Sequence, residues 1–293
     1  MKSNTQIFLE NSFFSLLSLP KIIALTKIKA LKNPAPLKKK SDCIILGNGP
    51  SLSATIPQIE TIRNKYDLAC VNYFALTEAF QKLKPQHYIL NAPELWMNDV
   101  EENYLNKAAK LFNTLADSTT WPLNLFIAVS ASKSYSWQEK IKKNKNINIV
   151  YFNTTPIEGF KSLIKKAIYK GWGMPRPHNV LIPSIVISLR MGYANTYLTG
   201  ADHSWLSEIW VDDSNNVFLT QKHFYDEKEA KAAPMKKLGK GRRTLPEILS
   251  KFTYAFTAYF ELDKIAKEKN QQILNATKGS FIDAFDRVKE IPS

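Results

Sequence analysis

The sequence predicts an α/β fold of the Rossmann-like kind: a mostly parallel, doubly wound sheet with helices on both faces. Continuous apolar runs alternate with segments of helical periodicity along most of the chain. Apolar runs without polar alternation are typical of parallel strands that are buried on both faces. Most of these runs end in asparagine, aspartate or glycine. The carboxyl ends of parallel strands meet at one edge of an open sheet, which is where ligands bind.

Seven strands are expected, and two long periodic segments supply the clearest helices. The expected strands are DCIILGN (42–48), YDLACVN (66–72), QHYILN (86–91), LNLFIAVS (123–130), NINIVYFN (146–153), YANTYLTGAD (193–202) and QQILNA (271–276). The two helices are SIVISLRMGY (184–193) and LPEILSKFTYAFTAYFELDKIAKEKN (245–270). Strands alternating with helices indicate a sheet that is covered on both sides.

The stretch CIILGNGPSL (43–52) has the form of a strand that turns into a helix around a nucleotide. Gly47 and Gly49 allow a tight turn, and Ser51 is expected to cap the next helix so that its amides face a phosphate. The dinucleotide fingerprint requires a third glycine where this chain has Leu52, and no Walker lysine follows. A single phosphate or a mononucleotide therefore fits better than a dinucleotide.

Polar residues recur at the ends of the expected strands. They are Asn48, Asn72, Asn91, Asn153, the run Asp202-His203-Ser204, and Asn275. One such asparagine is most simply a turn residue, because asparagine tolerates left-handed backbone angles. Repetition at three consecutive strands makes a shared ligand site about as good an explanation, since converging amides suit neutral polar ligand groups.

The first 40 residues form a basic, apolar extension with two open interpretations. One is a pair of helices packed on the domain, with Lys38 to Lys40 as a solvated linker. The other is an amphipathic, lysine-flanked segment that lies on an anionic membrane surface. Glu10, Asn11 and Pro20 interrupt the pattern of a secretory signal, and no transmembrane helix is expected.

Composition limits the partners and the chemistry. The net charge of +14 should attract an anionic partner: nucleic acid, acidic lipid, or a phosphorylated or carboxylated substrate. No nucleic-acid recognition motif accompanies it, so nucleic acid is not the expected partner. Cys43 and Cys70 lie in expected strands without metal-ligand spacing, which favours a reducing compartment. Asp212 and Asp213 read as a loop turn, and no metal site is expected.

The remainder of the chain, residues 41–293, is expected to be one domain with a lid at about 206–244. Residues 220–244 are charged and aperiodic, which is typical of a long binding loop. This loop holds a dense basic cluster, which is either solvated or closes on an anionic ligand. The cluster consists of Lys236, Lys237, Lys240, Arg242 and Arg243.

Four segments resemble, in order, the bacterial sialyltransferases of glycosyltransferase family 42. They are IILGNGPSL, CVNYF, YILNAPELW and IPSIVISLRMGYANTYLTGADHSW, within roughly residues 41–205. A weaker similarity follows in QQILNAT. GNGPSL is also similar to a segment of related polysaccharide-locus proteins and of the archaeal pterin diphosphokinase-like family.

The resemblance implies transfer of a sugar acid, sialic acid or another ulosonic acid such as Kdo, from a CMP-activated donor. The acceptor would be a glycolipid or polysaccharide of the lipopolysaccharide or capsule, and neither metal nor cofactor would be required. Contacts to the donor nucleotide-sugar would come from Gly47, Asn48, Gly49, Ser51, Asn72, Asn91, Asn179 and Ser184. The segment HNVLIPS (178–184) departs from the family pattern. So does GADHSW, where Asp202, His203 and Ser204 stand at positions that carry an aspartate and aromatic residues in the family.

The base that takes the acceptor proton is expected to be one of the four histidines. His87 opens an apolar strand and is expected to be structural, and His178 to line a loop. By the order of the family's residues His223 would be the base, with Tyr225 in place of a phosphate-binding tyrosine and His203 as a phosphate contact. The reverse assignment of His203 and His223 stays open.

The expected enzyme works in the cytoplasm, peripherally at the inner face of a bacterial inner membrane. Two other functions remain open. One is an ATP- and magnesium-dependent enzyme like the pterin diphosphokinases, and the other is a basic protein that binds nucleic acid or membrane.

Overall fold

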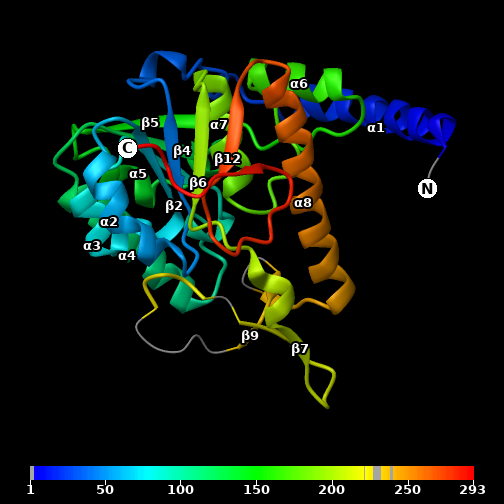
Figure 1. The fold of residues 1–293 in the computed structure, drawn as a ribbon. Helices are drawn as coiled ribbons and strands as arrows, with labels where there is room; N and C mark the ends of the chain where they lie inside the picture. The colour runs from blue at the N-terminus through cyan, green and yellow to red at the C-terminus, as the bar shows by residue number, and fades with distance from the viewer. Residues whose placement is uncertain (1–2, 221, 227–231, 238–239) are drawn as a thin grey trace.

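The computed structural model describes residues 3–220, 222–226, 232–237 and 240–293. Its centre is an eight-stranded, all-parallel sheet in the order β13-β12-β6-β1-β2-β3-β4-β5, which confirms the expected Rossmann-like α/β fold (Figure 1). The strands are β1 (Cys43–Leu46), β2 (Asp67–Val71), β3 (His87–Leu90), β4 (Leu123–Ala128), β5 (Ile147–Phe152), β6 (Asn195–Thr199), β12 (Gln272–Asn275) and β13 (Asp286–Arg287).

All seven expected strands belong to this sheet, and one further strand was not expected. β13 has two residues, and both are exposed. A strand this short at the edge of the sheet carries no apolar run, so the sequence gives no signal for it. β1, β2 and β3 are buried along their whole length, in agreement with their unbroken apolar character.

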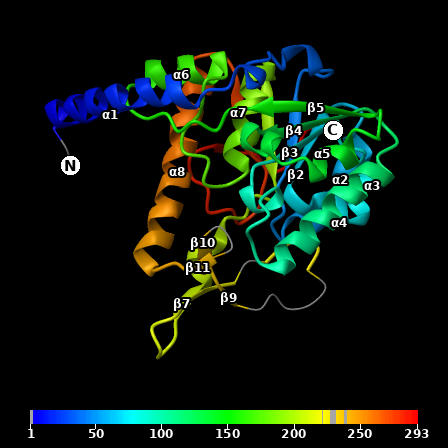
Figure 2. The same cartoon turned by 180° about the vertical axis from the view of Figure 1, so that it is seen from behind.

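The chain order places a switch point between β1 and β6. From β1 the chain builds outward through β2, β3, β4 and β5, and then returns so that β6 pairs with β1 on the other side. Because parallel crossovers are right-handed, the two halves place their helices on opposite faces. Figures 1 and 2 show α2–α5 on one side of the sheet and α6–α8 on the other. The helices are α2 (Leu52–Ile62), α3 (Glu78–Leu83), α4 (Glu102–Ser118), α5 (Ser136–Ile141), α6 (Lys161–Lys170), α7 (Leu181–Met191) and α8 (Leu245–Lys267).

Helix α7 fills the layer between the sheet and its neighbours α6 and α8. Every residue of α7 except Arg190 is buried. A helix that is apolar all round is stable only when it is covered on all sides. Its position over β1 and β2 therefore fixes the segment just before it, residues 177–180, against the carboxyl edge of the sheet.

The region expected to be a long aperiodic lid, about 206–244, contains a small antiparallel sheet. It is made of β7 (Ile209–Val211), β8 (Val217–Leu219) and β9 (Ala233–Pro234), followed by the pair β10 (Lys236–Lys237) and β11 (Lys240–Arg242). Asp212 accepts three hydrogen bonds in the β7–β8 turn, as expected for a loop aspartate. Val217 and Leu219 pack with Ile248 and Phe252 of α8 in a second apolar cluster. The strands are too short to show a periodic pattern in the sequence.

The first 40 residues contain one long helix, α1 (Asn4–Leu25), where a pair was expected. Two short 3-10 turns follow at Ile28–Ala30 and Ala35–Leu37. The supposed linker is anchored, because the amides of Lys39 and Lys40 donate to the buried carboxylate of Asp67 at 2.7 and 3.1 Å. By length and composition alone α1, with a mean hydropathy of 1.3, could cross a membrane, contrary to the expectation. A signal sequence or a buried core helix can pass the same test.

Candidate functional site

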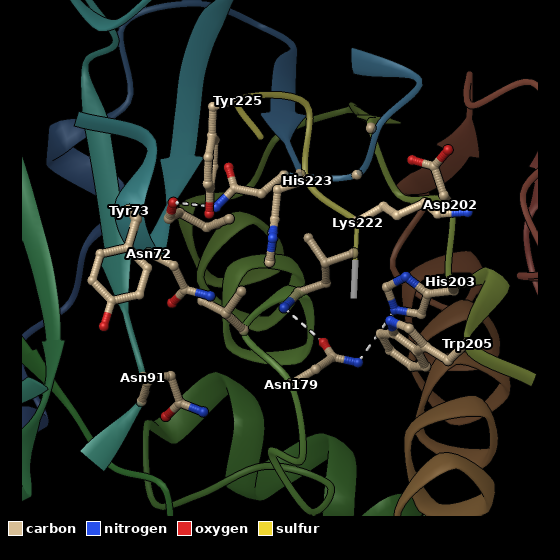
Figure 3. A pocket seen from close by; sticks show the side chains of 18 of the residues that line it. Asn72, Tyr73, Asn91, Asn179, Asp202, His203, Trp205, Lys222, His223 and Tyr225 are labelled. Carbon is tan, nitrogen blue, oxygen red and sulfur yellow. Dashed lines mark hydrogen bonds between the residues drawn. The ribbon is translucent and has the colours of Figure 1, made fainter. Parts of the chain in front are cut away.

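A pocket of about 840 Å³ opens at the carboxyl edge of the sheet, at the switch point between β1 and β6 (Figure 3). This volume lies in the range of small-molecule sites, about 300 to 1,000 Å³. The ends of β1, β2, β3 and β6 supply one wall. Helix α4, the start of α8, the segment 177–181, Thr220 and the segment 222–226 supply the others. Of the expected site residues, it is lined by Gly47, Asn48, Gly49, Asn72, Asn91, Asn179, Asp202, His203, Ser204, His223 and Tyr225.

The glycine-rich turn after β1 presses directly against the turn after β6. The amides of Gly47 and Gly49 donate to the carbonyls of Thr199 and Gly200, both at 2.8 Å. A Cβ atom on Gly47 would lie 2.4 Å from the Gly200 oxygen. Gly200 has a φ of +65°, and a Cβ there would meet Leu52. Leu52 thus stands where a dinucleotide fold needs its third glycine. The glycine that makes room for this leucine is Gly200, in the turn after β6.

Ser51 does not cap α2 as expected. Its hydroxyl donates to the carboxylate of Asp202 at 2.8 Å, and its amide donates to the same carboxylate at 3.2 Å. Asp202 therefore occupies the N-terminus of α2, where the sequence predicts a phosphate. A carboxylate is favourable at a helix N-terminus for the same electrostatic reason as a phosphate. Ser51 is not among the residues that line the pocket.

Three strand-end asparagines face the pocket. The Asn48 side chain donates to Val71, and Asn91 donates to Pro177, both at 3.1 Å. Asn72 has a left-handed φ of 49°, and its carbonyl accepts from the Tyr88 hydroxyl. The side-chain oxygens of Asn48 and Asn72 are buried without a hydrogen-bond partner among the described residues. Buried amide oxygens are normally satisfied, so this pair points to a donor group on a ligand.

The other two strand-end asparagines are structural. Asn153 exchanges hydrogen bonds with the main chain of Lys27 and donates to Gly171. Asn275 accepts from Thr277 and donates to Ile282. Both are buried and neither lines the pocket. Asparagine therefore recurs at the strand ends for two reasons: some of these residues line the pocket and others bind the main chain of neighbouring loops. The sequence alone does not distinguish the two groups.

His223 lies at the pocket on a segment that is tied to the glycine-rich turn. The next residue, Phe224, donates its amide to the Asn48 carbonyl at 3.1 Å and packs on Phe74. The His223 ring stacks on Tyr225 with 5.0 Å between centroids. Its Nδ1 lies 3.3 Å from the carboxylate of Asp226. Such an acidic partner fixes the orientation of an imidazole.

His203 lines the pocket but is largely buried in a hydrogen-bonded cluster. Its Nε2 lies 2.7 Å from the Tyr259 hydroxyl, and its ring packs at a tilt on Trp205. Its Nε2 also lies 3.3 Å from the Asn179 side chain (Figure 3). Burial lowers the pKa of His203 to about 3. The Asn179 oxygen accepts from the amide of Leu181 at the start of α7. His203 and Asn179 thus hold the start of α7 in place at the pocket. The sequence did not reveal this structural role.

Two further expected residues differ in their placement. Ser184 is buried within α7, where its hydroxyl donates to the Val180 carbonyl at 2.8 Å, and it does not line the pocket. Its side chain forms the local bond that serine commonly makes within a helix. Ser204 begins the 3-10 turn after β6 and does line the pocket.

One wall of the pocket is cationic, and most of it was not expected from the sequence. This cationic wall consists of Lys107, Lys110, Arg243 and Lys251. None of the four forms an ion pair among the described residues. Burial and the nearby Arg243 lower the pKa of Lys251. Of the lining carboxylates, Asp202, Asp226 and Glu208 already have partners on the protein, which leaves Glu94 among four cations.

His178 stands beside this cationic wall as a neutral imidazole. Burial and the charges of Lys251, Arg176 and Arg243 lower the pKa of His178 to about 4. Its Nε2 and the Nε of Arg243 are buried without hydrogen-bond partners among the residues described. The basic cluster expected at 236–243 contributes Arg243 to the pocket, while the side chains of Lys236, Lys237 and Lys240 lie outside the described part.

In the described part of the chain, no group of three or more His, Cys, Asp and Glu side chains is arranged to hold a metal ion. The expectation that the reaction needs no metal stays a prediction. Cys43 and Cys70 are both buried and unpaired with one another. Burial raises the pKa of both thiols.

No family model and no curated protein matches the chain. Among solved structures, the MAf glycosyltransferase from Magnetospirillum magneticum AMB-1 matches with a TM-score of 0.50 and 9% sequence identity. The match covers 97% of this chain and 39% of that one. The chain shares its fold with part of a bacterial glycosyltransferase. At this identity the likeness describes the fold alone.

The buried histidines should make the fold sensitive to acid. His203, with a pKa of about 3, and His87, with a pKa of about 4, are both neutral in the folded chain, whereas an unfolded histidine takes up a proton near pH 6.5. Their contribution is complete above pH 6.5 and is lost as the pH falls from there toward 4.

For His203 alone we expect the free energy of unfolding to fall by about 2 to 3 kcal/mol between pH 7 and pH 4.5. Urea titrations of the wild type and of His203→Gln at the two pH values would measure this fall in the free energy of unfolding. Protonation of carboxylates changes both proteins alike, so the difference between them reports His203. An equal fall in both proteins would contradict the assignment.

Proposed function

We propose that the chain is a glycosyltransferase that moves a sugar acid from a CMP-activated donor to a lipopolysaccharide or capsule acceptor. The observation that carries the proposal is the pairing of His223 with Asp226 at a pocket that also holds two unpartnered amide oxygens, those of Asn48 and Asn72. This combination provides a general base and a neutral polar binding surface within one site. The shared fold with a bacterial glycosyltransferase and the sequence resemblance to family 42 support it.

The reaction requires a base for the acceptor and donors for the leaving phosphate. Nε2 of His223 would take the proton of the acceptor hydroxyl as its oxygen bonds to the anomeric carbon. The bond from that carbon to the phosphate oxygen breaks, and its electron pair leaves with CMP. Asp226 stabilises the imidazolium that forms. Buried His203, with Nε2 engaged by Tyr259, is the less suitable base.

Two tyrosines and the cationic wall can meet the charge of the leaving phosphate. Burial raises the pKa of Tyr73 and of Tyr225, so both hydroxyls keep the proton that they would donate. Arg243 and Lys251 supply positive charge at the same pocket. Preformed donors and charges in a partly dry site favour the state in which the phosphate is fully charged.

A single phosphate suits this pocket better than a diphosphate. The amide of Ser51 at the start of α2, a common second phosphate site, already donates to Asp202. The carboxylate of Asp202 would repel a phosphate placed there. The buried oxygens of Asn48 and Asn72 can accept hydrogen bonds from the amino group of cytosine or from sugar hydroxyls.

A thermal-shift series would test the donor directly. The purified chain is heated with CMP, CDP, UDP, GDP or ATP, each with magnesium and with EDTA, and with cytidine as the control that lacks phosphate. We expect CMP to stabilise the chain equally in magnesium and in EDTA, by about 2.7 kcal/mol at 100 times its dissociation constant. Cytidine should give a smaller shift.

Each other outcome would overturn a stated part of the proposal. A response to ATP that depends on magnesium would replace the transferase with a diphosphokinase-like enzyme. A response to UDP or GDP would keep a glycosyltransferase and discard the CMP-activated sugar acid. A shift with CMP that EDTA abolishes would contradict metal independence.

A further inference from the structure

Helix α1 is attached to the protein by two serines, by Phe8 and by Ile22. Ser18, the one buried residue of α1, exchanges hydrogen bonds with the main chain of Glu158, both at 2.9 Å. Ser15 accepts from the Phe160 amide at 2.9 Å. Between them Gly159, with a φ of +112°, lies so close to Ser15 that any Cβ would collide with it. The helix is therefore a fitted part of the fold, and without it three consecutive residues of this loop would lose their contacts.

The remaining sides of α1 are apolar and exposed. Phe8, Phe13, Leu16 and Ile23 are 60%, 58%, 67% and 85% exposed, and Ile28 just beyond the helix is 86% exposed. Ile7, Leu9, Leu17, Leu19 and Leu25 are also among the exposed large apolar residues. In an ordinary surface helix the apolar side faces the core and the polar side faces water. Here most of the large apolar side chains of the helix face water instead.

A contiguous apolar surface of this kind normally binds a membrane or another protein. The charge around it favours a membrane. The first 40 residues contain eight lysines and one glutamate, which is half of the net charge of +14. Helix α6, which lies alongside α1 in Figures 1 and 2, adds Lys166 and Lys170, while its Lys161 and Lys165 share an ion pair with Glu268. Basic residues flanking an apolar helix are attracted to anionic lipid headgroups.

We propose that α1 binds in the plane of a lipid bilayer that contains anionic lipids. The inference does not depend on the proposed sugar transfer. α1 projects from one end of the molecule, and the small β7–β9 sheet lies at the opposite end (Figure 1). The bilayer would cover the exposed apolar sides of α1, while Ser15 and Ser18 keep their contacts with the loop at 158–160.

The contacts of α1 favour an in-plane orientation over a transmembrane one. A helix of 22 residues is about 33 Å long, enough to span a hydrocarbon core of about 30 Å. However, Phe8 packs on Phe160 with 5.5 Å between ring centroids, and Ser15 and Ser18 bond to the same loop. These contacts cover three turns of the helix. A spanning α1 would either lose them or carry the polar loop into the hydrocarbon.

Vesicle flotation would test the binding. The full chain is mixed with vesicles of phosphatidylcholine alone, or of phosphatidylcholine and phosphatidylglycerol at about 3:1, and floated in about 0.1 M and 0.5 M salt. We expect binding to the anionic vesicles at least about tenfold stronger than to the neutral ones, and weaker at high salt. Equal binding to both vesicles, or none, would overturn the proposal.

A pair of matched double variants tests whether α1 is the binding surface. Phe13→Gln/Leu16→Gln removes two exposed apolar side chains from α1 and should lower the partition coefficient at least about tenfold. Tyr135→Gln/Phe281→Gln removes two others of 74% and 44% exposure elsewhere, and should leave it within about twofold. Circular dichroism and melting curves check that both variants fold. An equal loss in both variants, or in neither, would contradict the role of α1.

A depth measurement separates in-plane from transmembrane binding. Phe13→Cys and Ile23→Cys are labelled with an environment-sensitive fluorophore, which is specific because Cys43 and Cys70 are buried. Lipids brominated at different depths should quench both labels at the same shallow depth. A deep position for one label and a shallow one for the other would show that α1 spans the bilayer. Dimers in light scattering without vesicle binding would show that a second copy covers α1.

Discussion

Replacing His223 with alanine is expected to lower kcat about 10²- to 10⁴-fold, with the thermal shift given by CMP unchanged. The imidazole would remove the acceptor proton in the transition state, and general bases contribute about this much to catalysis. Nothing in the fold depends on the ring, which is held by Asp226 and stacks on Tyr225. The measurement is the steady-state release of CMP from the donor that the thermal-shift series identifies.

Two control variants make this test specific. Asp226→Asn keeps the shape of the partner but removes its charge, so we expect a smaller loss of kcat and an altered pH profile. His178→Asn removes another pocket histidine, one that the structure holds neutral next to three cations, and should cost less than tenfold. If kcat fell as much in His178→Asn as in His223→Ala, the assignment of His223 as the base would be wrong.

Gly200→Ala is expected to destabilise the fold by about 2 to 4 kcal/mol. Two costs add: the alanine must hold a φ of +65°, and its Cβ would lie 2.8 Å from both the Gly47 carbonyl and the Leu52 side chain. Both neighbours belong to the main core and cannot easily move. Urea titration at pH 7 gives the free energy of unfolding.

Gly192→Ala separates the two costs. Gly192 also has a positive φ, of +77°, but a Cβ there would meet nothing within 4 Å. We expect it to lose only the conformational part, about 1 kcal/mol. If Gly200→Ala were no worse than Gly192→Ala, the close approach of the β1 and β6 turns would not matter for stability.

The large parallel sheet could be predicted because each of its principal strands is an unbroken apolar run that ends in a polar residue. The 206–244 region could not be, since strands of two or three residues carry no period. In the N-terminal segment the sequence showed apolar residues and lysines. It did not show that the small polar residues Ser15 and Ser18 face inward, because that depends on a loop more than 130 residues away.

The position of the pocket could be predicted from the strand ends, but the roles of several residues within it could not. Asp202 and Ser51 form a hydrogen bond with each other. Asn179 and His203 both form hydrogen bonds with Tyr259, a residue of α8 that no local motif connects to them. Lys107 and Lys251 look like ordinary solvated helix residues in the sequence. Only the arrangement of α4 and α8 around the sheet edge brings them to the same cavity.

The separation of the two apolar clusters has a consequence for how this chain can change during evolution. The carboxyl edge of the sheet is built from turns in van der Waals contact, around Gly47 and Gly200, where almost any new atom disturbs the central sheet. The small sheet rests on Ile248 and Phe252 at the beginning of α8, apart from the main core. Insertions and substitutions in that sheet are expected to change the packing of this second cluster and not that of the main core. The side of the pocket near this small sheet can therefore diverge while the side built on Gly47 and Gly200 stays the same.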